Sequence, residues 1–583
     1  MVLAEYDYLF AIGVIFAFLD AWNIGANDVA NSWATSVASR SLTLIQAMIG
    51  ASIMEFAGCV GVGARVSDTI RTKIVDPTLY EGEPAMLMLG MVCAVVGSSV
   101  WLTLATKTGM PVSTTHSIMG GVIGMGIASV GAKNVTWVAP PGSEGTSVIN
   151  TGVVAVFLAW VITPTISAVI ASIIFLITKY GVMLRKDPVK KAFALVPVYF
   201  AITAMLLCML LLWKGGNYEV NLTEGGIAGT IVGVGVGWGV LVALFLMPWL
   251  WRVVVMDDWQ MRWYHIALGP FLLKRPSPPA PPADFTGAIR NFYEGHLTME
   301  ELQTKRAAAG SDEEAPGSAA AKEAKIADAL VNSSNNSDAS ADHEITHAPQ
   351  RKSLIGPKPE GLPWYSGAML FWYLKKGLLN GVDRDIVSAQ RSKDVLSGDL
   401  EEAHARAAHY DNKAEFMYSF LQIMTACTAS FVHGANDISN AIGPFATIYQ
   451  IWRNGDITGS KAPVPTWILV FGGVALIIGI WTYGYNIMSH LGNKLTLNSP
   501  SRGFSMELGS ATTVIMATRL KLPVSTTQCI TGAIVGVGLC NGDWRALNWR
   551  MIAWIYMGWI LTLPCAGIIS GCLMGIIINA PRW

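Results

Sequence analysis

The sequence predicts an all-α membrane protein with about twelve membrane segments arranged as two repeats of inverted topology. The chain is 52% hydrophobic and only 14% charged, with a mean hydropathy of +0.44, which is unlike the composition of soluble globular domains. Two short phrases also occur twice. Gly25–Asn31 (GANDVAN) returns as Gly434–Asn440 (GANDISN), and Pro111–Thr115 (PVSTT) returns unchanged as Pro523–Thr527. Paired polar breaks in corresponding apolar segments are typical of the binding sites of secondary transporters.

Each predicted segment is an apolar run close to the roughly 20 residues that span a bilayer. The first is expected to be a retained span, because residues 1–7 lack the basic start of a cleavable signal peptide. The segments of the first half begin near Tyr8, Ile45, Ala85, Val112, Ile149, Ala192 and Ile227, and those of the second half near Phe416, Val464, Phe504, Val524 and Met551.

A hydrophilic insert separates the two apolar halves. Residues 1–255 are predicted to form an N-terminal membrane region with the first repeat, and residues 415–583 a C-terminal membrane region with the second. Residues 256–414 are predicted to be a largely disordered insert, because the Ala-, Ser-, Asn-, Glu- and Lys-rich tract from Ala307 to Ser340 cannot bury enough apolar surface to fold.

The distribution of basic residues predicts the orientation. Lysines and an arginine cluster between Lys179 and Lys191, in the loop after the fifth segment, and such clusters mark the cytosolic side. This placement puts the insert in the cytosol, both termini outside, and the glycosylation sequons at Asn134 and Asn221 outside as well. An odd number of segments separates the two copies of the Gly-Ala-Asn-Asp phrase, so the repeats are expected to be inverted.

The Pro-Val-Ser-Thr-Thr phrases are predicted to bind an oxyanion. Proline and a hydroxyl residue are favoured in the first turn of a helix, and the free N–H groups and positive dipole of a helix N-terminus suit a phosphate group. Two such N-termini that face each other would surround one tetrahedral anion. The predicted anion-binding residues are Ser113, Thr114, Thr115, Ser525, Thr526 and Thr527.

The Gly-Ala-Asn-Asp phrases are predicted to bind the cation that balances this anion, because amide and carboxylate oxygens suit a hard cation. The glycine and the small residue after it can break the helix. The two aspartates bind sodium or accept a hydrogen bond from a protonated phosphate, and the sequence does not choose between these roles. The predicted residues are Asn27, Asp28, Asn31, Asn436, Asp437 and Asn440.

Other polar residues interrupt apolar runs. Glu55 and Glu507 are predicted to serve cations or gating, because ionisable residues inside a membrane are functional candidates. Asp20 is a weaker candidate that could sit at an interface. His116 and His433 are interpreted as packing residues, since neither recurs in the other copy.

The doubled GANDxxN and PVSTT phrases together resemble those of the inorganic phosphate transporter (PiT) family, over residues 1–255 and 415–583. The phrase Gly503–Leu508 (GFSMEL) and the long insert resemble fungal sodium–phosphate symporters in particular. The resemblance implies sodium-driven import of inorganic phosphate across the plasma membrane by a homodimer in membrane lipid, with the PVSTT phrases at the tips of re-entrant hairpins. Sodium is then the co-transported ion and the only metal, and no cofactor is expected.

Other function classes remain. A proton-coupled transporter of phosphate or of another oxyanion would use the same carboxylates, and a phosphate-sensing receptor would need a folded cytosolic domain. An enzyme is not expected, because no nucleophile–base pair or metal-ligand set is evident. The net charge of zero gives no indication of a nucleic-acid partner.

Overall fold

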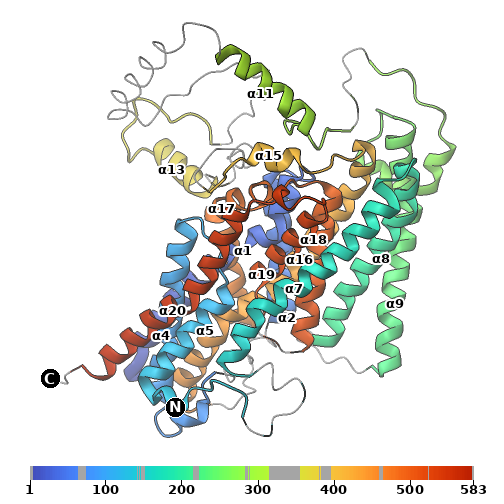
Figure 1. The fold of residues 1–583 in the computed structure, drawn as a ribbon. Coiled ribbons are helices and arrows are strands. Elements are labelled where there is room, and N and C mark those ends of the chain that lie inside the picture. Colours follow the sequence, from blue (N-terminus) through green and yellow to red (C-terminus); the bar gives the residue numbers. More distant parts are fainter. Residues whose placement is uncertain are drawn as a thin grey trace.

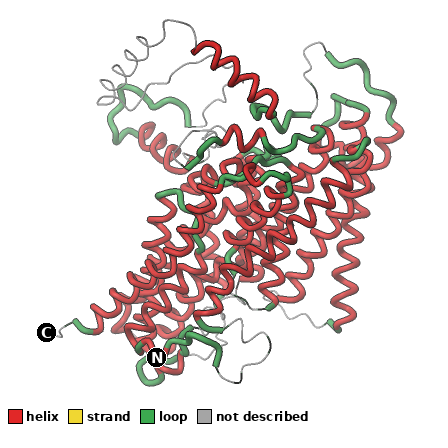
Figure 2. Tube along the Cα trace, viewed as in Figure 1, coloured by secondary structure: helices red, strands yellow, loops and turns green. Residues whose placement is uncertain are grey.

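The computed structural model describes residues 4–63, 74–140, 151–214, 222–282, 289–313, 355–379, 396–457, 464–520 and 524–580, with the single residues 142, 145, 287, 381 and 522. Within these ranges the protein is helical and has no strand, apart from an isolated bridge between Val75 and Val135 (Figure 2). The predicted all-α class is therefore confirmed.

The helices before the insert are α1 (Asp7–Ala38), α2 (Leu44–Val62), α4 (Pro84–Lys107), α5 (Thr114–Val130), α7 (Val153–Thr178), α8 (Pro188–Lys214), α9 (Glu224–Leu241) and α10 (Met247–Leu250). The insert holds α11 (Met299–Glu313), α13 (Gly367–Leu379) and α15 (Leu400–Ala405). After it come α16 (Asn412–Asn454), α17 (Thr466–His490), α18 (Pro500–Arg519), α19 (Thr526–Leu539) and α20 (Trp549–Ile578).

Short 3-10 and π-helical segments complete the described elements. The 3-10 turns are Ala4–Tyr6, Pro77–Tyr80, Ala132–Asn134, Trp263–Lys274, Gly492–Lys494 and Trp544–Ala546, and the π segments that extend α7, α9 and α10 are Lys179–Met183, Val242–Leu246 and Trp251–Val255.

A helix lies over each predicted apolar segment, but the helices differ in their capacity to cross a membrane. Among the described residues, eight are long and apolar enough to do so: Asp7–Ala38, Leu44–Val62, Pro84–Lys107, Val153–Met183, Pro188–Leu212, Glu224–Val255, Thr466–Lys494 and Trp549–Ile578. The two helices that follow the PVSTT phrases are shorter, at 17 residues for α5 and 14 for α19. Helices of that length fall below the roughly 20 residues that a full crossing requires.

The helices that carry the repeated phrases pack reciprocally. Helix α1 packs on α17 while α16 packs on α2, and α5 packs on α20 while α19 packs on α7. Helices α1 and α16 also contact each other, and each of them contacts the PVSTT helix of the other copy. The four phrases therefore meet in the middle of the bundle, with α8 and α9 at one edge (Figure 1).

The insert and the termini lie at opposite ends of the bundle. Figure 1 shows α11, α13 and α15 at one end and both chain termini at the other. Most of the Ala307–Ser340 tract lies outside the described residues. Tyr293, in the described part of the insert, donates a hydrogen bond of 2.7 Å to the buried Glu415 of α16, which also accepts from the backbone N–H of Ser501 at 2.7 Å. The insert is thereby joined to the ends of α16 and α18.

Candidate functional site

The two PVSTT phrases place the N-termini of α5 and α19 in the core. Ser113 caps α5 by accepting a hydrogen bond from the His116 backbone N–H at 3.2 Å, and Ser525 caps α19 by accepting from Gln528 at 3.4 Å. Both serines are buried. Capping satisfies one free N–H at each helix start, so the predicted helix starts are present. Pro523 lies outside the described residues.

Each asparagine that closes a Gly-Ala-Asn-Asp phrase binds the threonine pair of the other copy. The Asn31 amide donates to the Thr527 hydroxyl at 2.8 Å and to Thr526 at 3.3 Å. The Asn440 amide donates to Thr115 at 3.1 Å and to Thr114 at 3.2 Å. Residues almost 500 positions apart in the chain thus form one site, and neither copy completes it alone.

The two buried aspartates accept most of the threonine hydroxyl hydrogens. Asp28 accepts from Thr114 at 2.9 Å, from Thr527 at 3.0 Å and from Asn31 at 3.0 Å. Asp437 accepts from Thr526 at 2.6 Å and from its neighbour Asn436 at 2.8 Å. A hydroxyl has a single hydrogen to donate, so each of these threonines donates either to an aspartate or to a phosphate oxygen. Anion binding at this place requires rearrangement of the threonine–aspartate bonds.

Although glycine and a small residue can break a helix, the helices continue through the Gly-Ala-Asn-Asp phrases. Helices α1 and α16 are unbroken over Gly25 and Gly434. A Cβ on Gly25 would lie 2.0 Å from the Leu476 carbonyl oxygen of α17, and a Cβ on Gly434 would lie 2.2 Å from the Glu55 carbonyl oxygen of α2. These glycines allow close approach of a neighbouring backbone, as small residues do between membrane helices.

Asn27 has a positioning role in this structure. Its amide donates to Thr106 at 3.0 Å and to the Met110 carbonyl at 3.2 Å, and its oxygen accepts from the Val112 backbone N–H at 3.2 Å. Asn27 therefore fastens the segment that leads into Ser113, whereas Asn31 reaches the threonine pair. Although the two amides are one helical turn apart, they have different partners.

His433 belongs to the central cluster, so its interpretation as a packing residue is wrong. Its Nε2 lies 3.2 Å from Asp437 Oδ2 and 3.5 Å from Asp28 Oδ2, and its Nδ1 lies 3.0 Å from Glu55 Oε2. The ligand atoms of Asp28, His433 and Asp437 lie within 4.8 Å of one another. The spacing of His433 from Asp437, i to i+4, places both on one helix face and could have indicated this role from the sequence.

His116 is buried against Trp160, with ring centroids 5.7 Å apart, which agrees with a packing role.

Glu55 and Glu507 lie in different surroundings. Glu55 reaches the central cluster through His433 and accepts from Ser430 at 3.3 Å. Glu507 is held apart from that cluster, between α1 and α16, where it accepts four hydrogen bonds. Its donors are Thr35 at 2.6 Å, Ser36 at 2.8 Å, Thr425 at 2.6 Å and Gln422 at 3.2 Å. The structure therefore brings one of the two predicted glutamates to the paired aspartates.

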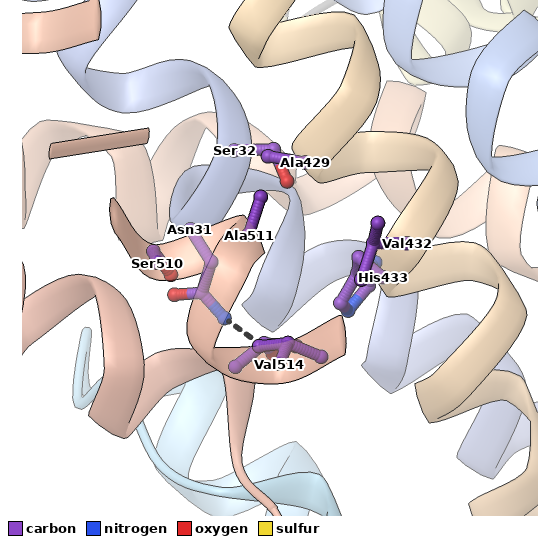
Figure 3. Close-up of a pocket in the computed structure, with 9 residues that line it drawn as sticks. Asn31, Ser32, Ala429, Val432, His433, Ser510, Ala511 and Val514 are labelled. Carbon is purple, nitrogen blue, oxygen red and sulfur yellow. Dashed lines mark hydrogen bonds between the residues drawn. The ribbon is translucent and has the colours of Figure 1, made fainter. Parts of the chain in front are cut away.

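A small cavity adjoins the central cluster. Its volume is about 10 Å³, room for roughly a single water molecule. Figure 3 shows Asn31 extending into this region from α1 and His433 lying on α16. The lining residues are Asn31, Ser32, Ala429, Val432, His433, Ser510, Ala511, Val514 and Thr526. A phosphate is larger than a water molecule, so its entry requires the walls from α16 and α18 to move.

Comparison with known proteins assigns this chain to a family. The model of the phosphate transporter family (PHO4) matches residues 24–570. The chain belongs to the phosphate transporter family. A relative from Neurospora crassa named phosphate-repressible phosphate permease pho-4 is 64% identical, over 100% of this chain and 99% of its own. Sodium-dependent phosphate transporter 1 of Mus musculus is 28% identical, over 98% of this chain and 96% of its own.

A solved structure supports the fold. The chain titled "The sodium-dependent phosphate transporter" superposes with a TM-score of 0.58 at 24% identity, and the match covers 98% of the present chain and 100% of that one. The predicted resemblance is confirmed, and this protein is a membrane phosphate transporter and not an enzyme.

The roles of the two capping serines can be tested with a substitution that a helix N-terminus tolerates. Glycine costs only a few tenths of a kcal/mol relative to serine at an N-cap, so Ser113→Gly and Ser525→Gly remove the hydroxyl at little structural cost. If each hydroxyl donates to phosphate, the apparent phosphate affinity in uptake assays should fall by roughly ten- to a hundred-fold. The matched control is Thr43→Gly, at the N-cap of α2. Unchanged affinity in both serine variants would remove these hydroxyls from the anion site.

Proposed function

We propose that this transporter imports inorganic phosphate together with sodium, by alternating access across the plasma membrane. The observation that carries the proposal is the pair of buried aspartates within a shell of neutral donors. Among the described residues, no Lys or Arg forms a hydrogen bond or ion pair with Asp28 or Asp437. Two buried carboxylates and an incoming anion need positive charge nearby, because unpaired charge is costly away from water.

Sodium is the proposed source of that charge. Oxygen ligands from carboxylates, amides and hydroxyls suit hard cations, and the ligand atoms of Asp28 and Asp437 are close enough to share an ion. The proposed cation-binding residues are Asn27, Asp28, Asn31, Asn436, Asp437, Asn440, Glu55 and Glu507. The names of the mouse relative and of the superposed structure, both sodium-dependent, support this choice.

Phosphate is proposed to bind between the two helix N-termini, at Ser113, Thr114, Thr115, Ser525, Thr526 and Thr527, beside the two aspartates. Sodium bound to Asp28 and Asp437 would release the threonine hydroxyls from the carboxylates, because a carboxylate that binds a cation no longer needs those donors. The freed hydroxyls would then donate to phosphate oxygens. Cation and anion binding would thereby be linked through the same side chains.

Proton coupling is the second candidate, and the position of His433 favours it. An imidazole between Asp28, Asp437 and Glu55 can carry a proton to or from these carboxylates. The structure of this site therefore suits either ion, and transport with separated gradients distinguishes them.

Uptake of radiolabelled phosphate into vesicles that contain the purified protein tests the coupling ion. An inward sodium gradient at equal pH should drive accumulation, and replacement of sodium by choline should abolish it. Equilibrium binding should agree, because linkage requires sodium to raise phosphate affinity by the same factor that phosphate raises sodium affinity. Accumulation driven by a proton gradient alone, with phosphate affinity indifferent to sodium, would replace this proposal with the proton-coupled one.

The proposed topology places residues 1–255 and 415–583 in the membrane as inverted repeats, both termini outside and the 256–414 insert in the cytosol. Its support is the position of the insert and the termini at opposite ends of the bundle (Figure 1). We also propose a homodimer, on the likeness to the PiT family.

An epitope placed within Ala307–Ser340 tests this topology. In intact cells it should be unreachable by antibody, and permeabilisation should expose it. Asn134, which is exposed at the end of the 3-10 turn Ala132–Asn134, should be the accessible sequon, whereas Asn221 lies outside the described residues. External labelling of the epitope would contradict the orientation.

A further inference from the structure

Seven of the residues that line the central cavity belong to the second repeat, and the first-repeat counterparts of four of them form a polar cluster. These four are Ala429, Val432, Ser510 and Ala511. Alignment of the repeated phrases pairs them, in the same order, with Asp20, Asn23, Ser98 and Ser99. The second copy thus places two apolar side chains on its site helix, α16, where the first copy places an aspartate and an asparagine on α1.

Asp20 and Asn23 lie on α1 and are fully buried where this helix packs against α4. Asp20 Oδ1 accepts from the Ser99 hydroxyl at 3.3 Å, and the Asn23 amide donates to the Thr103 hydroxyl at 2.9 Å. Asp20 Oδ2 and Asn23 Oδ1, one helical turn apart, have no hydrogen-bond partner among the described residues. Buried acceptors without a donor are rare and costly.

The fold itself does not require this polar pair. Ala429 and Val432 occupy the corresponding positions of α16 in the same kind of helix, and there they leave no buried acceptor unsatisfied. Asp20 Oδ2 and Asn23 Oδ1 are two buried acceptors in a membrane helix that lack a donor. Such a pair indicates a ligand that brings positive charge. Carboxylate, amide and hydroxyl oxygens together are the ligands of a hard cation.

We propose that Asp20, with Asn23 and Ser99, forms a cation-binding site on the outer access pathway of the transporter. This rests on the proposed sodium-coupled alternating access. Inverted repeats that exchange conformations open equivalent pathways on opposite sides of a fixed site. The present cavity is lined mostly by second-copy residues, and Ala429 and Val432 lie between His433 and the insert end of α16. The opposite pathway is therefore expected to be lined by their first-copy counterparts. Asp20 lies between Asp28 and the N-terminal end of α1 along the helix. That end of α1 lies on the side of the bundle opposite the insert (Figure 1).

The two pathways differ in their affinity for a cation, and this difference favours sodium entry from the outer side. The outer pathway has a carboxylate, which concentrates sodium before it reaches Asp28. The inner pathway has Ala429 and Val432 at the matching positions, so it has no counterpart of the Asp20 site. Sodium is therefore captured at an Asp20 site on the outer side that has no equivalent on the inner side.

Two variants test the site through the sodium dependence of phosphate uptake. Asp20→Asn keeps the shape and removes the charge, and the double variant Asp20→Ala with Asn23→Val installs the residues of the second copy. Both should raise the external sodium concentration for half-maximal uptake by about ten-fold or more, while phosphate KM at saturating sodium stays near that of the wild type. Asp7→Asn is the control, because Asp7 has the same charge on the same helix and, among the described residues, its side chain accepts a hydrogen bond only from Trp452 at the surface.

Binding of ²²Na⁺ to the purified proteins gives a readout that does not depend on transport. The wild type should bind more sodium per chain than either Asp20 variant, and Asp7→Asn should match the wild type. If Asp20 instead holds a proton shared with Asn23, Asp20→Asn will bind and respond to sodium as the wild type does, which overturns this site alone. A wild type that neither binds sodium nor needs it for uptake would overturn the sodium coupling and this site together.

Discussion

Asp28→Asn and Asp437→Asn should each reduce sodium-dependent phosphate uptake by roughly a hundred-fold or more, with little loss of folded protein. Asp28 accepts three hydrogen bonds and Asp437 two, and both face His433. A hydrogen bond to a charged group contributes about 1.5–3 kcal/mol, and the proposed cation loses a carboxylate ligand in addition. Asparagine retains the shape and can still accept from threonine, so the fold should persist. Initial uptake rates at several sodium concentrations measure the effect.

The matched control for these variants is Asp257→Asn. Asp257 pairs with Lys413 at 2.8 Å on an exposed surface, and exposed ion pairs contribute only about 0–1 kcal/mol. Asparagine also tolerates the left-handed backbone of Asp257, whose φ is 48°. Sodium-dependent phosphate uptake by the Asp257→Asn variant should therefore match that of the wild type. Wild-type sodium dependence in Asp28→Asn or Asp437→Asn, with protein present at normal levels in the membrane, would exclude that aspartate from the coupling site.

Most of the bundle could be predicted from hydropathy, because a long apolar run has few alternatives to a helix in lipid. The repeated phrases also predict which residues meet. Polar residues are costly in a membrane segment, so a polar phrase that recurs in both halves indicates that the two copies serve one common site. Reciprocal bonding of Asn31 to Thr527 and of Asn440 to Thr115 could not be derived from spacing. It depends on how α1 and α16 approach the opposite PVSTT helices, which is a property of tertiary packing.

Two features of the site have physical causes that the sequence does not show. Glycine costs about 1 kcal/mol in a helix interior and can break a helix, yet at Gly25 and Gly434 packing against α17 and α2 outweighs that local preference. The other feature is the role of His433, which repeat symmetry does not predict because Ile24 takes its place in the first copy. Repeat symmetry governs the backbone of the two halves, whereas a side chain that serves a single ion need occur only once.

The close helix contacts predict a second large effect, on stability. Gly25→Ala and Gly434→Ala place a methyl group 2.0 Å from the Leu476 carbonyl oxygen and 2.2 Å from the Glu55 carbonyl oxygen. Backbone atoms cannot rotate away as a flexible side chain can, so α1 must separate from α17, or α16 from α2. Overpacking of a core costs about 1–3 kcal/mol, occasionally more. Both variants should show a clearly lower Tm in detergent than the wild type.

Gly233→Ala and Gly237→Ala on α9 are the controls, because a Cβ at either position meets nothing within 4 Å. There alanine should be neutral or slightly stabilising, since it favours a helix over glycine by about 1 kcal/mol. A wild-type Tm in both Gly25→Ala and Gly434→Ala would show that these helices pack less closely than described. Gly434→Ala should also impair transport in the protein that does fold, because it displaces the backbone of Glu55, whose carboxylate lies 3.0 Å from His433. Stability and the central cluster therefore depend on the same contact between α16 and α2.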